Sequence, residues 1–125
     1  MECTLEVART KEGDYYFKIV NDEKQVMAQS GEFETLITCK RAIHALCHCI
    51  KAPIFEAVDG AFWTGAAVYE VFETEGRYTF LLKGDYGEVL AYGKVFSNMR
   101  TCRNAISAMV KMDLHEESDE FEAIF

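Results

Sequence analysis

The chain of 125 residues is half hydrophobic and 13% aromatic, which suits one domain with a packed core and excludes an intrinsically disordered chain. Its net charge of −8 argues against a general nucleic-acid or anionic-membrane binder, because such proteins neutralise phosphates with Lys and Arg. No segment approaches the ~20 apolar residues of a membrane span, and no signal peptide is visible. Because no export signal is visible, the five cysteines are expected to be reduced thiols in a cytoplasmic protein. The charge and the lack of a membrane span predict no nucleic-acid partner and no membrane partner.

The chain contains an internal duplication. Many residues between positions 13 and 50 are found again 63 positions later; Val26, for example, corresponds to Val89. The shared positions of the first copy are Gly13, Tyr15, Phe17, Asp22, Val26, Ala28, Phe33, Thr38, Cys39, Ala42, Ile43 and Ala45. Phe55 returns as Phe121, so the second copy is slightly longer near its end. Shared positions mark what each unit needs in order to fold. We predict a single domain, 1–125, made of a first repeat over 1–59, a connection over 60–65 and a second repeat over 66–125.

The first repeat opens with three alternating apolar stretches, which predict strands over 5–10, 15–20 and 26–30. A turn of Asn, Asp, Glu and Lys separates the last two of these strands. Behind Thr35, a good N-cap, apolar residues then recur at the spacing of one helix face. They are Leu36, Cys39, Ile43, Leu46 and Ile50. Pro53 indicates the end of this helix, and a fourth strand is predicted over 54–58.

The second repeat predicts the same order, with strands over 68–74, 78–83 and 89–93, a helix behind Asn98, and a last strand over 120–125. The apolar stripe of this helix consists of Met99, Cys102, Ile106 and Met109. Each unit is therefore β-β-β-α-β, which places the chain in the α+β class. One unit of about 60 residues with a single helix is marginal for burying a core, so we expect the two units to share one sheet.

The duplication also sorts the faces of the strands. Side chains alternate across a sheet, so the positions that match between the copies are expected beneath the helices. These are Tyr15, Phe17, Val26 and Ala28 with their counterparts. The positions that differ are expected on the opposite face. They are Tyr16, Lys18, Met27 and Gln29 in the first copy, and Thr79, Leu81, Leu90 and Tyr92 in the second.

The chain resembles the YegP-like family, small proteins with one or two copies of a domain of unknown function. The resemblance rests on Tyr15-Tyr16-Phe17-Lys18-Ile19 with Gln25-Val26-Met27-Ala28-Gln29-Ser30, and on Tyr78-Thr79-Phe80-Leu81-Leu82 with Glu88-Val89-Leu90-Ala91. Arg103-Asn104-Ala105-Ile106 is similar to the family's Asn-Gly-Ile helix motif, although Ala105 and Ala42 stand where Gly is common. The resemblance implies two tandem units forming a single antiparallel sheet with two helices on one face and the last strands exchanged between units. It implies no activity and no catalytic residues.

The first helix carries the densest cluster of potential metal ligands, Cys39, His44, Cys47, His48 and Cys49. His44, Cys47 and His48 have spacings that could converge on one helix face. However, the apolar stripe turns both histidines towards solvent, and no paired Cys-x-x-Cys motif supplies a second arm. Surface histidines and core thiols are the favoured interpretation, so we expect no bound metal, no cofactor and no catalytic residue.

The aromatic residues Phe62 and Trp63 of the connection could anchor a ligand or a partner, but such residues more often fold back over an exposed sheet edge. The face expected to lie away from the helices is more suggestive, since Val20 and several large apolar residues would make it unusually apolar for a surface in water. We predict an interaction surface on this face and at the connection. Its residues are Tyr16, Met27, Leu81, Leu90, Tyr92 and Trp63.

Two classes of function follow from these residues. The first is a non-catalytic interaction module, associating with a second copy of itself or with an unknown protein through the open face of the sheet. The alternative is a small-molecule-binding protein or minor enzyme that uses the Cys/His helix or a pocket near Trp63. No convergent set of acid, base and nucleophile is visible in the sequence, which favours the first class and a protein that is not an enzyme.

Overall fold

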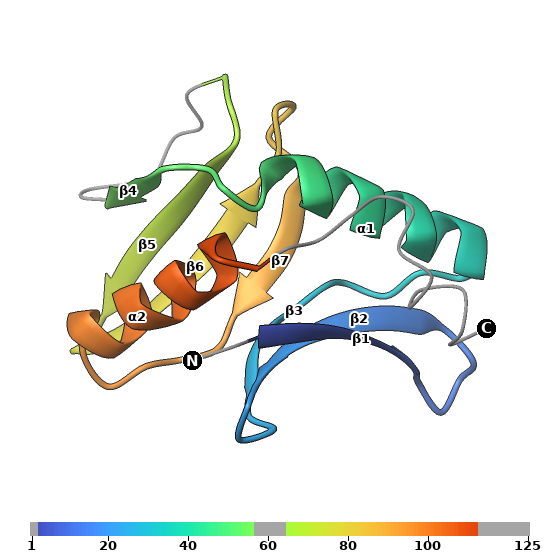
Figure 1. Ribbon diagram of the computed structural model, residues 1–125, viewed down its shortest axis with the longest axis horizontal. Coiled ribbons are helices and arrows are strands. Elements are labelled where there is room, and N and C mark those ends of the chain that lie inside the picture. The colour runs from blue at the N-terminus through green and yellow to red at the C-terminus, as the bar shows by residue number, and fades with distance from the viewer. Residues whose placement is uncertain (1–2, 57–64, 113–125) are drawn as a thin grey trace.

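The computed structural model describes residues 3–56 and 65–112, which form one sheet of seven strands and two helices (Figure 1). The first half contributes β1 (Cys3–Arg9), β2 (Tyr15–Asn21), β3 (Val26–Gln29), α1 (Leu36–Cys49) and β4 (Ile54–Glu56). The second half contributes β5 (Val68–Thr74), β6 (Arg77–Lys83), β7 (Val89–Gly93) and α2 (Met99–Val110). The α+β class is confirmed, and the strands and helices predicted within the described residues agree with these bounds to within a few residues.

The strands are ordered β1-β2-β3-β7-β6-β5-β4, so the two halves join between β3 and β7. The sheet twists strongly, and β1 and β2 run at a large angle to β5 and β6 (Figure 1). The expectation of a wholly antiparallel sheet is wrong at one edge, because β4 pairs with β5 in parallel, Ile54 opposite Tyr69. A connection through residues 57–67 joins these strands instead of a tight hairpin, and parallel neighbours require such a longer connection.

Each helix begins at the N-cap that the sequence predicts. The Thr35 side chain accepts a hydrogen bond from the Thr38 amide at 3.2 Å, and the Asn98 side chain accepts one from the Thr101 amide at 2.9 Å. These bonds satisfy amides that have no partner within the first helical turn. The caps therefore fix where both helices begin over the sheet.

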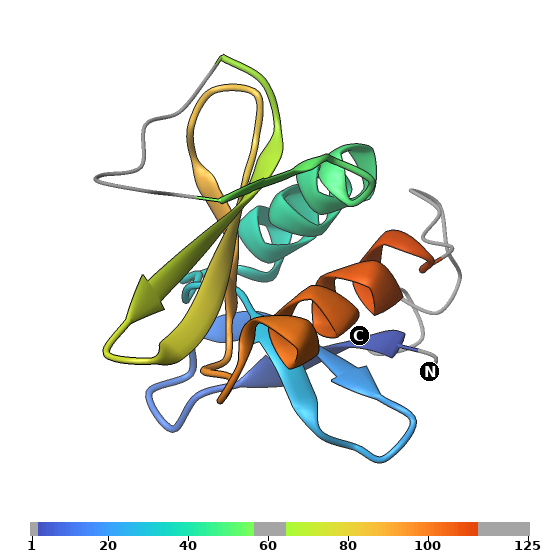
Figure 2. The same cartoon turned by 90° about the vertical axis from the view of Figure 1, so that its left-hand side faces the viewer.

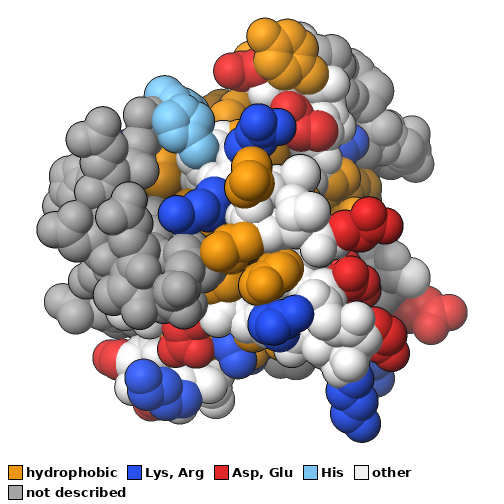
Figure 3. Space-filling model, turned by 90° about the vertical axis from the view of Figure 1, so that its right-hand side faces the viewer, with side chains coloured by type: hydrophobic (Ala, Val, Ile, Leu, Met, Phe, Trp, Pro, Cys, Tyr) orange, Lys and Arg blue, Asp and Glu red, His pale blue; other side chains and the backbone are white. Residues whose placement is uncertain are grey.

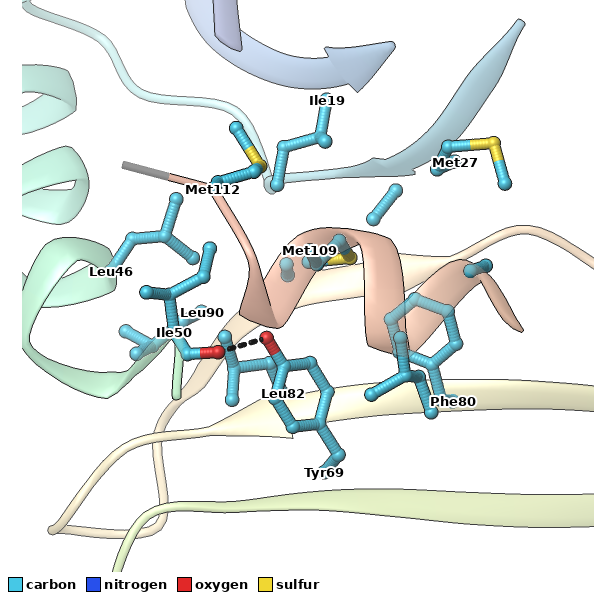
Figure 4. Packing of buried hydrophobic residues seen from close by; sticks show 14 of the residues in the cluster. Ile19, Met27, Leu46, Ile50, Tyr69, Phe80, Leu82, Leu90, Met109 and Met112 are labelled. Atoms are coloured by element: carbon cyan, nitrogen blue, oxygen red, sulfur yellow. Dashed lines mark hydrogen bonds between the residues drawn. The ribbon is translucent and has the colours of Figure 1, made fainter. Parts of the chain in front are cut away.

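Both helices lie on the same side of the sheet and bury one continuous core against it (Figure 2). Phe17, Ile19, Phe80 and Leu82 are fully buried there, as the sorting of the strand faces predicts for the two phenylalanines. The phenol of Tyr69 reaches across this core and donates a hydrogen bond of 2.6 Å to the carbonyl oxygen of Ile50 at the end of α1 (Figure 4). Most of this face is thus closed to solvent by the helices.

The assignment of Met27 and Leu90 to the face away from the helices is wrong. The ladder skips one residue in each half: Ile19 pairs with Ala28 and Val20 with Val26, and an equivalent skip leaves out Leu90. Such β-bulges interrupt the alternation of side chains. Met27 is 4% exposed and Leu90 is 7% exposed, and both belong to the core (Figure 4). Val20 is buried as well, so it adds nothing to an exposed patch.

Strand pairs recur between the two halves with the offset seen in the sequence. Tyr15 bridges Phe33 in the first half, and Tyr78 bridges Phe96 in the second. The bulges also fall at corresponding places, beside Ile19 and beside Leu82. Trp63, Phe62 and the strand predicted over 120–125 lie outside the residues that the structure describes.

Candidate interaction face

One row of side chains crosses the whole sheet on the side away from the helices, which we call the outer face. The row contains one residue from each strand, and each pairs directly with the next. In order, they are Glu6, Lys18, Gln29, Tyr92, Leu81, Glu70 and Phe55. Leu81 lies between Phe80 and Leu82 on β6, both in the core, so strand alternation directs the row away from the helices.

Tyr92 occupies the centre of this row, between Gln29 and Leu81, and its side chain is 47% exposed. Leu81 is half-buried, as is Tyr16, which lies two residues before Lys18 on β2 and therefore on the same face. Three of the six predicted interaction residues, Tyr16, Leu81 and Tyr92, are thus brought together on the outer face. The apolar part of this face is smaller than predicted, because Met27 and Leu90 are in the core.

Charged pairs flank the centre of the row on both sides. Lys18 Nζ lies 3.9 Å from a carboxylate oxygen of Glu6 at a partly exposed position, where such a pair contributes little. Lys83 Nζ lies 2.8 Å from Oε1 of Glu70, whose side chain is fully buried. Neither oxygen of Glu70 accepts a well-aligned hydrogen bond from the described residues. A buried pair of this kind is weak evidence for stability, but it requires both partners to remain in place.

Sequence reasoning missed the Glu70–Lys83 pair. The signal was a single glutamate within the otherwise apolar strand Val-Tyr-Glu-Val-Phe, with a lysine at the end of the strand that pairs with it. An acidic residue at such a position requires a cation or a hydrogen-bond donor nearby. The duplication concealed the pair, because the residue 63 positions before Glu70 is Val7.

The histidines of α1 are exposed, as predicted. The rings of His44 and His48 contact each other edge to face with centroids 5.0 Å apart, and the described histidines are seen at the surface in Figure 3. Within the described parts of the chain, no three His, Cys, Asp or Glu side chains gather as metal ligands would. Figure 3 also shows hydrophobic side chains in small groups on this side, with charged side chains around them.

All five cysteines are free thiols. Burial raises the pKa of Cys39 and of Cys102 to about 11, and burial followed by the negative charge of Asp85 raises the pKa of Cys49. A nucleophilic cysteine needs the opposite shift, towards the thiolate at neutral pH. These three side chains act chemically as small apolar groups of the core.

A groove of about 680 Å³ opens beside Tyr92 at one end of the outer face. It is bounded by the β1–β2 turn, by β2 and β7, and by the residues that follow β3. The lining consists of Arg9, Thr10, Lys11, Tyr16, Gln29, Ser30, Gly31, Glu32 and Tyr92. The side chains of Tyr16, Gln29 and Tyr92 on the outer face thus share this groove, whereas the guanidinium of Arg9 lies over the ring of Tyr15, its partner across β1 and β2.

Neither of the described helices has the length and apolar character required to cross a membrane.

No protein-family model and no curated protein matches the chain.

Two solved structures match the chain over most of its length. The solution NMR structure of a UPF0339 protein from Shewanella oneidensis has a TM-score of 0.69 at 13% identity, covering 89% of this chain and 84% of that protein. The solution NMR structure of yegP, a protein of unknown function from E. coli, has a TM-score of 0.67 at 10% identity, covering 88% and 84%. The chain thus has a YegP-like fold, and the resemblance seen in the sequence is confirmed at the level of the fold.

Proposed function

On a YegP-like fold, which it shares with proteins of unknown function, we propose that this chain is a non-catalytic interaction module that contacts its partner through the outer face. The observation that carries this proposal is Tyr92, 47% exposed at the centre of the row. A central strand position is flanked by side chains on both sides, so an aromatic residue exposed there is available to a partner. Aromatic anchors of this kind supply much of the binding energy at protein interfaces.

The partner that we propose is a second copy of the chain, because two-fold homodimers are the commonest soluble oligomers. Gln29 and Tyr92 are equivalent positions of the duplication and pair with each other at the centre of the sheet. A two-fold axis parallel to the strands would place Tyr92 of each copy over Gln29 of the other. The exposed apolar area is modest, so a weak and reversible dimer is expected rather than an obligate one.

The further expectations from the sequence belong to the same proposal. Free cysteines agree with a cytoplasmic location, and the raised pKa values of Cys39 and Cys102 agree with a protein that is not a thiol enzyme. We also retain the expectation of no bound cofactor and no nucleic-acid partner, on the basis of the net charge of −8.

We also propose that the two halves are exchanged repeats. The position of β4, from the first half, beside β5 of the second half supports this arrangement. In the duplication β4 corresponds to the strand predicted over 120–125, and β5 corresponds to β1. The last strand would then pair with the outer edge of β1. Deletion of residues 120–125 should lower the free energy of unfolding, whereas a folded chain of unchanged stability would reject the exchange.

Sedimentation velocity tests the homodimer. The wild-type chain should sediment as a mixture of monomer and dimer at high micromolar concentration, whereas Tyr92→Lys and Leu81→Lys should each sediment as monomers. In the proposed arrangement, each substitution would bury a charge without an opposite partner in the contact between the two copies. Tyr86→Lys is the matched control, because Tyr86 is 88% exposed in the turn before β7 and lies off the row. It should dimerise like the wild type.

Circular dichroism of each variant establishes that the fold is kept, since both substituted side chains lie opposite the core. A wild-type chain that remains monomeric at high micromolar concentration would remove the homodimer. Dimers that persist in folded Tyr92→Lys and Leu81→Lys chains would place the contact on another surface.

A further inference from the structure

We infer that the exposed surface of α1 and α2 is a docking site for an acidic peptide segment of a partner protein. Six exposed lysines and arginines lie on the helices or directly after them, and we call this surface the basic layer. They are Lys40, Arg41, Lys51, Arg100, Arg103 and Lys111. The inference goes beyond the interaction module, because it assigns a second surface, on the opposite side of the sheet from the outer face, and a partner of different chemistry.

Charge is segregated along the chain. None of the 21 acidic residues falls within residues 35–55 or 89–112, the two stretches that contain the helices, whereas seven of the 13 lysines and arginines do. These stretches therefore carry +7, and the rest of the chain carries −15. A surface that is merely solvated usually mixes both signs of charge. A surface with one sign of charge, opposite to that of the whole chain, attracts an anionic partner to one side of the molecule.

The cationic side chains lie opposite the core on both helices. Exposed polar residues recur at spacings of three and four on the side away from the buried stripe. They are Arg41, His44 and His48 on α1, and Arg100, Arg103, Ser107 and Lys111 on α2. Both helices lie on the same side of the sheet (Figure 2), so both rows face away from it. Lys51 joins the helix ends, because its Nζ donates a hydrogen bond of 3.0 Å to the Val110 carbonyl.

Helix stability does not account for these cations. Acidic side chains are preferred in the first turn of a helix, where the helix dipole is positive, yet neither helix has one there. The first turn of α2 contains Arg100 instead, which the dipole disfavours. Neither helix contains an acidic residue with which its own cations could pair. The positive ends of the two helix dipoles add to the charge of the side chains, which strengthens the attraction for an anion.

The chemistry of the basic layer favours a peptide over other large anions. Neither α1 nor α2 contains Phe, Tyr or Trp, so the layer offers no aromatic platform on which unpaired bases could stack. Ile37, 63% exposed, is the one exposed large hydrophobic side chain of these two helices, whereas a helix that lies on a membrane needs a broad apolar face. Binding to a lipid surface or to single-stranded nucleic acid is therefore disfavoured.

The length of the layer suits a short peptide. The 14 residues of α1 extend over about 21 Å, the length of about six residues of an extended chain. Described carboxylates flank α1 at both ends: Glu34 precedes it, and Asp85 and Glu88 act electrostatically on Cys49 at its end. A longer polyanion would meet these carboxylates, but a peptide of about six acidic residues fits between them.

The experiment is an amide-resolved NMR titration of the full chain with N-acetyl-hexaglutamate amide at low ionic strength. The resonances of Arg41, Lys51, Arg100 and Lys111 should shift and saturate, with a dissociation constant of about 0.1–1 mM. Hexaglutamine, which has the same length without the charge, should produce no saturable shift. A rise in salt from about 20 mM to about 200 mM should weaken binding about tenfold, because contacts between exposed charges are screened.

Matched charge variants locate the site. The double variant Arg41→Gln, Arg100→Gln should bind hexaglutamate at least about fivefold more weakly. The control is Lys11→Gln, Arg77→Gln, which removes the same charge at two exposed positions outside the basic layer and should bind like the wild type. All four side chains are exposed, and circular dichroism establishes that both variants keep the fold.

Other occupants are distinguished in the same titration. Hexathymidylate should bind more weakly than hexaglutamate, and equal or tighter binding would make the layer a nucleic-acid surface and overturn the inference. Residues 113–122, outside the described residues, contain six acidic residues. If hexaglutamate binds the variant Glu116→Gln, Glu117→Gln, Asp119→Asn but not the wild type, the occupant is this segment of the chain itself, and the external partner is rejected.

The inference is also overturned if hexaglutamate gives no saturable shifts in any of these chains, if the shifts lie outside the helices, or if folded Arg41→Gln, Arg100→Gln binds as tightly as the wild type. The titration is repeated in the Leu81→Lys chain, because Leu81 belongs to the proposed dimer surface and not to the basic layer. Saturable binding there supports the basic layer even if the dimer fails, and a dimer without peptide binding leaves only the interaction module.

Discussion

The ring of Phe80 lies so close to the backbone of Gly93 that a Cβ atom at this glycine would be 2.5 Å from the ring. The ring is fully buried and stacks with Phe96 at a centroid distance of 6.3 Å, so it has little freedom to move away. In the first half, Ser30 stands at the position of Gly93, and its hydroxyl accepts a hydrogen bond from the amide of Phe17. The corresponding positions of the two halves, Ser30 and Gly93, therefore make different contacts with the corresponding phenylalanines.

Replacing Gly93 with Ala is expected to lower the free energy of unfolding by about 1–3 kcal/mol, the usual cost of forcing an extra methyl group into a packed site. Gly31→Ala is the control, since a methyl group there meets no atom within 4 Å, and it should change stability by less than ~0.5 kcal/mol. Urea denaturation of both variants measures the difference. Equal stabilities would mean that the Phe80 ring does not lie against Gly93.

The thiols of Cys39 and Cys102 predict a loss of stability in alkali. Burial raises the pKa of both to about 11, whereas an unfolded cysteine titrates near ~8.5. Ionisation therefore favours the unfolded chain: the stabilising contribution is complete below about pH 8.5 and is lost as the pH rises towards 11. Denaturant midpoints measured across this range should fall with pH, and more steeply than in a chain with both residues changed to Ala. Parallel pH dependences in the two chains would contradict the burial of these thiols.

At the scale of elements, the sequence predicts the strands, the helices and both N-caps, because each rests on a local periodicity or a local hydrogen bond. Such local patterns could not predict which face of the sheet each side chain of β3 and β7 occupies. Alternation places Met27 on the outer face, but the bulge beside Ile19 turns it into the core. Consecutive apolar residues, Val26-Met27-Ala28, were the available signal of this interruption. The parallel pairing of β4 depends on contacts distant in sequence, which no local pattern specifies.

The bulges make a prediction of their own. Met27→Ala and Leu90→Ala should each destabilise the chain by about 2–5 kcal/mol, as expected when a buried methyl-rich side chain is removed from a core. Gln29→Ala, at an exposed position of the same strand as Met27, should change stability by less than ~0.5 kcal/mol. Thermal or denaturant unfolding separates these outcomes. If Met27→Ala lost as little stability as Gln29→Ala, Met27 would not lie in the core, and the bulge beside Ile19 would be contradicted.

Considered as a whole, the molecule has two unlike sides. The helices and one face of the sheet form a continuous core, while the outer face carries a row of polar and aromatic side chains centred on Tyr92. The sequence predicts an apolar outer face, and three of the residues expected on it, Tyr16, Leu81 and Tyr92, lie there. The groove beside Tyr92 could not be predicted, because it joins residues that only the sheet brings together. The lone glutamate of β5 was a visible signal of the buried Glu70–Lys83 pair, but its lysine partner is identified only by the pairing of β5 with β6.

The most direct test of the outer face as a contact surface is an amide-resolved NMR spectrum recorded as the protein is diluted from high to low micromolar concentration. The resonances of Lys18, Gln29, Leu81 and Tyr92 should shift with dilution, because these residues form the centre of the row. Those of Ile43 in α1 and Ile106 in α2, both buried in the core, should stay constant. A spectrum that does not change with concentration, or one whose changes are confined to the helices, would contradict the proposed self-association through this face.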